Sequence, residues 1–188
     1  MKVLLGFASA MLALSLMAAG SASAQGKMTV SSPDIKPGAM ISMDQVFNGF
    51  GCTGKNISPE IKWSGVPAKA KSLALHVYDP DAPTGSGFWH FLVVNIPVTA
   101  TGLAKGAGDP KANALPAGAL MTRTDFGAPG WGGPCPPQGD KPHRYIFTLF
   151  AVDVDKLDVG ADTSAAVVGF NLHFHTVAKA SFTGKFGR

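Results

Sequence analysis

The stretch DPDAPTGSGFWHF, residues 79–91, decides how the rest of this chain is interpreted. It lies between two apolar runs, Leu73–Tyr78 and Leu92–Ile96, which are typical of buried strands. The stretch itself carries two aspartates, two prolines, two glycines and a Trp-His pair. Acidic groups and an imidazole on a rigid turn between buried strands predict one wall of a binding site.

Side-chain alternation predicts where the first aspartate of this stretch points. Successive side chains of a strand face opposite sides, so Leu75 and Val77 share one face with Asp79. Asp79 therefore lies at the end of a core-facing row. His76 falls on the other face, where we interpret it as a structural or surface histidine.

A second polar cluster, GGPCPPQGDKPHRY at residues 132–145, predicts the opposite wall of the site. Its prolines and glycines restrict the backbone before an apolar strand begins. On that strand His143 and Tyr145 face the same side, whereas Arg144 faces away and suits an ion pair with a loop acid. Prolines at this wall would form an apolar floor.

Convergence of the two walls would bring imidazoles, a phenol and carboxylates into one pocket. We expect His90, His143 and Tyr145 to donate hydrogen bonds, with Asp79 and Asp81 orienting the imidazoles. This set suits a small anion such as phosphate or a phosphoryl head group, and the sequence indicates no resident cofactor.

Each of these residues also has a simpler interpretation. Asp79 or Asp81 can cap a turn, and Trp89 can be wall and core. Two histidines and two aspartates also resemble a metal site, although neither His90 nor His143 belongs to an HxH or HExxH spacing. No GxSxG or phosphate-loop motif appears in the sequence. Cys135, with His143 as its base, would be a nucleophile only if it is not disulfide-bonded.

Composition favours one mostly-β domain. The 188-residue chain has 23 glycines and 14 prolines between short apolar runs, and its formal net charge of +4 is scattered rather than clustered. Without a basic stripe, nucleic acid is not an expected partner. Residues 159–188 suggest one or two short helices and a tail. We expect strands at Met28–Ser31, Ile61–Trp63, Leu73–Asp79, Phe91–Ile96 and Tyr145–Val152.

Residues 1–24 resemble a cleaved secretory signal peptide, with Lys2, an apolar run and Ala22-Ser23-Ala24 before the cleavage point. A retained membrane anchor is the alternative, but its apolar run is short. We expect one domain over residues 25–188, located in the periplasm or secreted, with no stable membrane insertion after cleavage. In an exported protein, Cys52 and Cys135 suit a disulfide; two buried free thiols are the alternative.

Six motifs together resemble a known family. They are NISPEIKW at 56–63, DPDAP at 79–83, GSGFWHFLVVNIP at 85–97, TRTDFG at 122–127, and GPCPPQG with HRYIFTLFAVD between 133 and 153. Because the motifs occur in this order and at this spacing, the chain resembles the phosphatidylethanolamine-binding proteins, also called Raf kinase inhibitor proteins. The resemblance extends from about Met28 to Arg188. The exported bacterial branch is the most similar.

The resemblance implies a Greek-key β-sandwich of two antiparallel sheets with short flanking helices. It also implies a cis peptide at Ala82–Pro83 and a pocket for phosphate or phosphorylated head groups. The C-terminal segment lacks the long helix of animal members, so the pocket is expected to be open or covered by the second subunit of a homodimer. The implied pocket residues are Asp79, Asp81, Trp89, His90, Gly133, Pro136, Pro137, His143 and Tyr145.

The sequence therefore predicts an exported, non-enzymatic protein that binds a small phosphorylated or anionic ligand or modulates another protein. An inhibitor or signalling partner of a hydrolase or host protein, acting through surface loops, is the alternative. A metal-assisted hydrolase is a third and weaker hypothesis.

Overall fold

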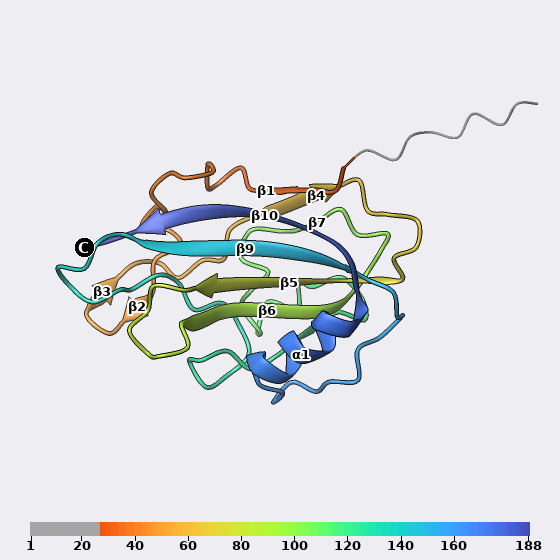
Figure 1. Cartoon of the computed structure of the whole chain (residues 1–188). Coiled ribbons are helices and arrows are strands. Elements are labelled where there is room, and N and C mark those ends of the chain that lie inside the picture. The colour runs from red at the N-terminus through yellow and green to blue at the C-terminus, as the bar shows by residue number, and fades with distance from the viewer. Residues whose placement is uncertain (1–26) are drawn as a thin grey trace, which may run out of the picture.

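The computed structural model describes residues 27–188, which form eleven regular elements (Figure 1). The predicted signal peptide lies outside the described residues. The elements are β1 (Thr29–Ser31), β2 (Asn48–Gly49), β3 (Cys52–Thr53), β4 (Ile61–Ser64), β5 (Ser72–Asp79), β6 (Phe88–Pro97), β7 (Gly102–Leu103), β8 (Leu120–Met121), β9 (His143–Val152), α1 (Ala165–His175) and β10 (Thr176–Phe186).

Two antiparallel sheets form the body of the protein. The large sheet has the order β10-β9-β5-β6-β8, and the small sheet has the order β1-β4-β7. Within the large sheet β5, β6 and β8 follow one another, and β9 then returns to pair with β5, which is the strand order of a Greek key. The sandwich predicted from the sequence is confirmed. A further hairpin, β2-β3, lies apart from both sheets.

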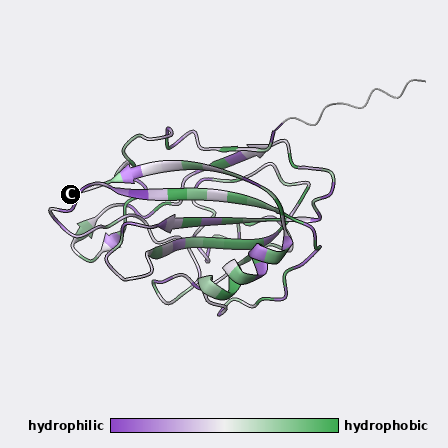
Figure 2. Cartoon of the chain, viewed as in Figure 1, coloured by the Kyte–Doolittle hydropathy of each residue, from purple (hydrophilic) through white to green (hydrophobic). Residues whose placement is uncertain are grey.

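Period-two alternation explains how the large sheet separates two apolar layers. Leu73, Leu75 and Val77 of β5 enter the core shared with the small sheet. Ala74 of β5 faces the other side, where it joins the cluster that includes Leu172 of α1. Figure 2 shows hydrophobic residues recurring along these central strands. The large sheet is thus covered on one face by the small sheet and on the other by α1.

The C-terminal segment differs from the sequence prediction. One helix is present, capped by the hydroxyl of Ser164, but residues 176–186 form the long strand β10 rather than a second helix or a tail. Phe182 and Phe186 of this strand are buried, and the strand pairs with β9 along its whole length. Alanines and a glycine interrupt the alternation of large apolar residues in this segment, so the sequence pattern did not identify it as a strand. No helix in the described part of the chain is long and apolar enough to cross a bilayer.

Candidate functional site

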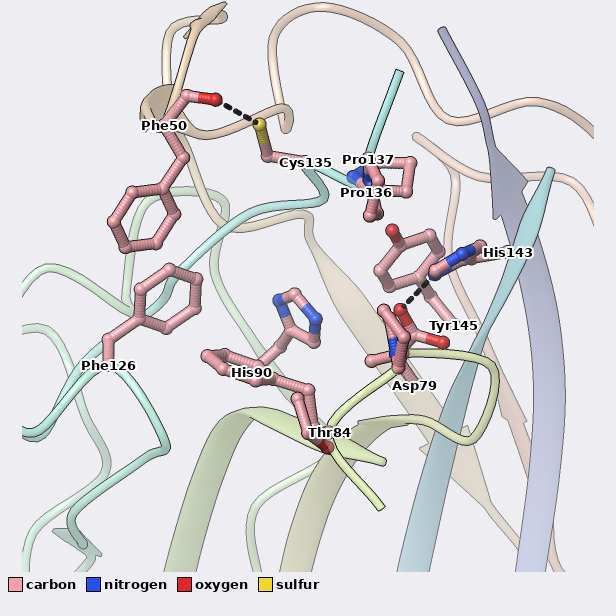
Figure 3. A pocket seen from close by; sticks show the side chains of 13 residues that line it. Phe50, Asp79, Thr84, His90, Phe126, Cys135, Pro136, Pro137, His143 and Tyr145 are labelled. Carbon is pink, nitrogen blue, oxygen red and sulfur yellow. Dashed lines mark hydrogen bonds and ion pairs between the residues drawn. The ribbon is translucent and has the colours of Figure 1, made fainter. Parts of the chain in front are cut away.

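The end of β5 and the beginnings of β6 and β9 surround a cavity of about 160 Å³ (Figure 3). Because these three strands are antiparallel neighbours, the end of β5 lies beside the starts of the other two. The cavity therefore lies at one end of the central strands of the large sheet. It is lined by Phe50, Asp79, Ala82, Pro83, Thr84, Phe88, His90, Phe126, Cys135, Pro136, Pro137, His143 and Tyr145.

A buried acid–imidazole pair forms one wall. Asp79 and His143 are 2% and 4% exposed, and the Nδ1 of His143 lies 2.8 Å from Oδ2 of Asp79. A carboxylate at this distance fixes the tautomer in which Nδ1–H donates. Oδ1 of the same aspartate accepts the backbone N–H of Asp81 at 2.8 Å. Nε2 of His143 is 3.4 Å from Asp140, whose side chain is much more exposed.

The Tyr145 hydroxyl is the most informative polar group of this wall. The side chain is 1% exposed and lines the cavity, yet its hydroxyl forms no well-aligned hydrogen bond with the described residues. Burial, followed by the negative charge of nearby Asp79, raises the pKa of the phenol. The hydroxyl therefore keeps its proton and remains a donor. A buried donor without a full partner is uncommon in folded proteins.

His90 occupies the middle of the pocket. Its Nδ1 lies 2.7 Å from the carbonyl oxygen of Gly132, so Nδ1 carries a proton and Nε2 is the nitrogen available to a ligand. Burial lowers the pKa of His90 below its ordinary value of 6.5, although the hydrogen bond to Gly132 opposes this shift. In the free protein the ring is neutral at neutral pH, and Nε2 is then an acceptor.

Three residues that were predicted to bind ligand lie outside the cavity lining. Asp81 instead holds Arg144 with two side-chain hydrogen bonds of 2.9 and 2.7 Å, which lower the pKa of Asp81 to about 2. This is the ion pair that the sequence predicted for Arg144. Trp89 packs on Tyr78 with ring centroids 4.4 Å apart, on the opposite face of β6 from His90.

Gly133, the third such residue, has a structural reason to be glycine. A Cβ atom there would lie 2.0 Å from the carbonyl oxygen of Gln45. Its N–H donates to the side chain of Asn56 at 2.8 Å. The two prolines that were predicted with it, Pro136 and Pro137, do line the cavity.

The Ala82–Pro83 dipeptide lines the cavity, but its peptide bond is trans, as are all the peptide bonds of the described residues. The cis bond implied by the family resemblance is therefore wrong for this structure. The adjacent turn is closed by hydrogen bonds of its own, including one from the Thr84 hydroxyl to the carbonyl of Gly87.

The opposite wall is made by loops that tertiary contacts connect. Cys52 and Cys135 form a disulfide with their Cα atoms 6.0 Å apart, which confirms the predicted pairing. The guanidinium of Arg188 donates to the carbonyls of Pro136 at 2.7 Å and of Phe50 and Gly51 at 3.1 Å. These bonds join the chain end to both disulfide-linked loops.

Aromatic side chains from these loops were missed by the sequence interpretation. Phe50 and Phe126 line the cavity opposite the acid–imidazole pair (Figure 3). Phe50 lies between two glycines and has a φ of 52°, an uncommon value for a residue with a Cβ atom. The glycines around Cys52 were the only available sequence signal. Among residues 27–188, no cluster of three or more histidine, cysteine or acidic side chains could hold a metal ion.

Comparison with known proteins agrees with this architecture. The family model for phosphatidylethanolamine-binding proteins matches residues 31–187. The chain belongs to the phosphatidylethanolamine-binding protein family. Its relatives include two proteins of Escherichia coli K12. YbcL is 51% identical over 154 residues, which cover 82% of this chain and 84% of YbcL. YbhB is 49% identical over 159 residues, which cover 85% of this chain and 99% of YbhB.

A solved structure extends the likeness to three dimensions. The crystal structure of E. coli YbcL, described as a new member of the mammalian family, superimposes with a TM-score of 0.85 at 48% identity. It covers 87% of this chain and 99% of the crystallised chain. The membership that the sequence motifs indicated is thus confirmed, and so is the sandwich fold.

Proposed function

We propose that this member of the family is an exported binding protein that takes a small acidic ligand of the phosphoryl class in the pocket between Asp79 and His90. The buried Tyr145 side chain carries the proposal, because it lines the cavity and its hydroxyl has a proton to donate and no well-formed acceptor. A ligand oxygen would supply the missing acceptor. Pro136 and Pro137 would shape the apolar floor beneath it.

The charges of the pocket indicate how an anion is accommodated. The Asp79 carboxylate disfavours a second negative charge, and its pairing with His143 reduces that effect. Nε2 of neutral His90 accepts rather than donates, because Nδ1 donates to Gly132. An anion therefore binds together with a proton, carried either by His90 or by the acid group of the ligand.

Binding, rather than catalysis, is the proposed role because the nucleophile candidates of the pocket are occupied. The sulfur of Cys135 is held in the disulfide, and the Thr84 hydroxyl donates to a carbonyl within its own turn. The remaining polar groups are suited to forming hydrogen bonds with a ligand and to fixing one imidazole orientation. A modulatory role towards another protein would use the same ligand-filled pocket as its signal.

Export is proposed from the signal-like residues 1–24, and the Cys52–Cys135 disulfide supports it because disulfides persist in oxidising compartments. The periplasm or the medium would be the location. N-terminal sequencing of the protein recovered from the periplasm would test the proposed cleavage after Ala24; a retained leader there would contradict it.

The binding proposal is tested by titration calorimetry with inorganic phosphate. Tyr145→Phe removes only the hydroxyl, so affinity should fall roughly tenfold while stability stays the same or rises, because a buried unsatisfied group is removed. His90→Ala should abolish measurable binding while circular dichroism remains native. His173→Ala, an exposed histidine of α1, is the matched control. Equal affinity in all four proteins would contradict the assignment of this pocket.

A further inference from the structure

We infer that the ligand of this pocket carries an aromatic ring next to its acidic group, so that an aryl phosphate or a related aryl acid fits better than phosphate itself. This inference rests on the proposed anion site. It adds a second subsite, formed by Phe50 and Phe126, that determines which acids are preferred.

Rings form an unbroken row from the polar end of the cavity to its mouth (Figure 3). The centroids of Tyr145 and His90 are 5.1 Å apart and those of His90 and Phe126 are 5.5 Å apart, both edge to face. Phe126 and Phe50 continue the row as nearly parallel rings 6.0 Å apart. A ligand whose acid group reaches Tyr145 and His90 therefore meets aromatic surface along the rest of its length.

The aromatic end is built before any ligand arrives. Phe126 also contacts Phe47 and Phe88, with centroids 4.6 and 4.9 Å apart, so its ring is fixed from several sides. The backbone of Phe50 is held by Arg188 and lies beside the disulfide. Rigid aromatic contacts lose little conformational entropy on binding, which favours ligand affinity.

Phe50 is nevertheless 72% exposed at the mouth of the cavity, although its backbone is restrained. Leaving an aromatic side chain in water forgoes the free energy of burying it. A ligand ring in contact with it would remove apolar surface of both partners from water. The exposure and the restraint together indicate a surface kept ready for an apolar group.

The size of the cavity selects a ring rather than a chain. Its volume of about 160 Å³ is far above the roughly 10–15 Å³ that a single water requires. It is also below the roughly 300 Å³ at which pockets for drug-sized molecules begin. There is space for an acid group and one ring, but not for the acyl chains of a phospholipid. Edge-to-face and offset contacts with Phe126 favour a planar ring over an alkyl group.

The test compares phosphate, phenyl phosphate and cyclohexyl phosphate by titration calorimetry at one pH. Phenyl phosphate should bind about tenfold more tightly than phosphate, and cyclohexyl phosphate should lie between them. Phe50→Ala should remove most of the phenyl advantage, so that this variant binds phenyl phosphate about as tightly as it binds phosphate. Phe170→Ala on α1 is the matched control, because Phe170 is 66% exposed and lies outside the cavity.

Several outcomes would overturn the inference. If phenyl phosphate and phosphate bind equally, there is no aromatic subsite, although the anion site stands. If cyclohexyl phosphate matches phenyl phosphate, the ligand need not be aromatic. If phenyl phosphate still binds more tightly than phosphate in both Phe50→Ala and Phe126→Leu, the phenyl ring of the ligand binds elsewhere. If none of the three compounds binds, the proposed anion site itself fails, and the aromatic subsite fails with it.

Discussion

The two walls of the pocket are positioned by different physical means. Asp79, His143 and Tyr145 belong to neighbouring strands of one sheet, whose hydrogen-bond ladder fixes their separation. The facing wall, with Phe50 and Cys135, belongs to loops that are connected by the disulfide, by the Arg188 hydrogen bonds and by a backbone hydrogen bond from Phe47 to Pro134. The strand wall carries the acid–imidazole chemistry, and the loop wall carries the apolar surface.

This difference suggests that the two walls can be altered independently. A change in the loop links should affect stability and the shape of the mouth but leave the strand-borne donors in place. A change in the protonation of His90 should affect only the ligand contacts that the strand wall makes. The following predictions test that separation.

The largest effect is expected from removing the disulfide. Cys52→Ser combined with Cys135→Ser should lower the free energy of unfolding by about 4 kcal/mol, because the unfolded chain regains the entropy of a large loop. Chemical denaturation measures this change. Phosphate affinity should persist, since its donors lie on strands, whereas any preference for phenyl phosphate should be lost. Loss of both affinities would show that the walls are not independent.

An intermediate effect on anion affinity is expected from a change of pH. Burial lowers the pKa of His90 in the free protein, and a bound anion would raise it again. The complex then holds one more proton, so affinity should rise by up to tenfold per pH unit as pH falls, levelling off below the free-protein pKa. Sulfate is a suitable probe because its own charge stays constant near neutral pH.

Calorimetric titration of sulfate between about pH 8 and pH 5 measures this slope. Phe50→Ala, on the loop wall, should keep the slope, while Tyr145→Phe should weaken binding at every pH without removing it. A flat profile in the wild-type protein would contradict proton-coupled binding at His90.

The smallest effect is expected at Asp81 and Arg144, which lie outside both walls. Asp81→Asn should cost less than about 1 kcal/mol of stability, because the ion pair is largely exposed to solvent. Arg144 lowers the pKa of Asp81, so the contribution of the pair is present above about pH 4 and lost as pH falls towards 2. Phosphate affinity should change by less than twofold. A tenfold loss of phosphate affinity would show that Asp81 takes part in ligand binding.

Asp81 and Trp89 were predicted to line the pocket but lie outside its lining, and they show where side-chain alternation no longer predicts position. Asp81 has the same parity as Asp79, but β5 ends at Asp79, so the rule no longer applies two residues later. Trp89 precedes His90 inside β6 and therefore faces the other side of the sheet. Had the strand been predicted to begin at Phe88, the same rule would have excluded Trp89.

Strand β10 was missed for a different reason. Its inward positions include Phe182 and Phe186, but Ala178, Ala180 and Gly184 weaken the period-two pattern that identifies a strand. Only pairing with β9 over the length of the strand determines its conformation. The glycine also lies where a Cβ atom would approach Ile41 within 2.8 Å, a close contact that sequence does not reveal.

By itself, the sequence determined the sandwich, the disulfide partners and the strand wall of the pocket, because alternation and motif spacing are local properties of the chain. Tertiary structure alone decided the aromatic part of the loop wall. Phe50 and Phe126 are far apart in sequence and share no period, so their approach to His90 depends on how separate loops pack together. The chemistry of the pocket was therefore readable from local patterns, whereas its selectivity arises from long-range packing.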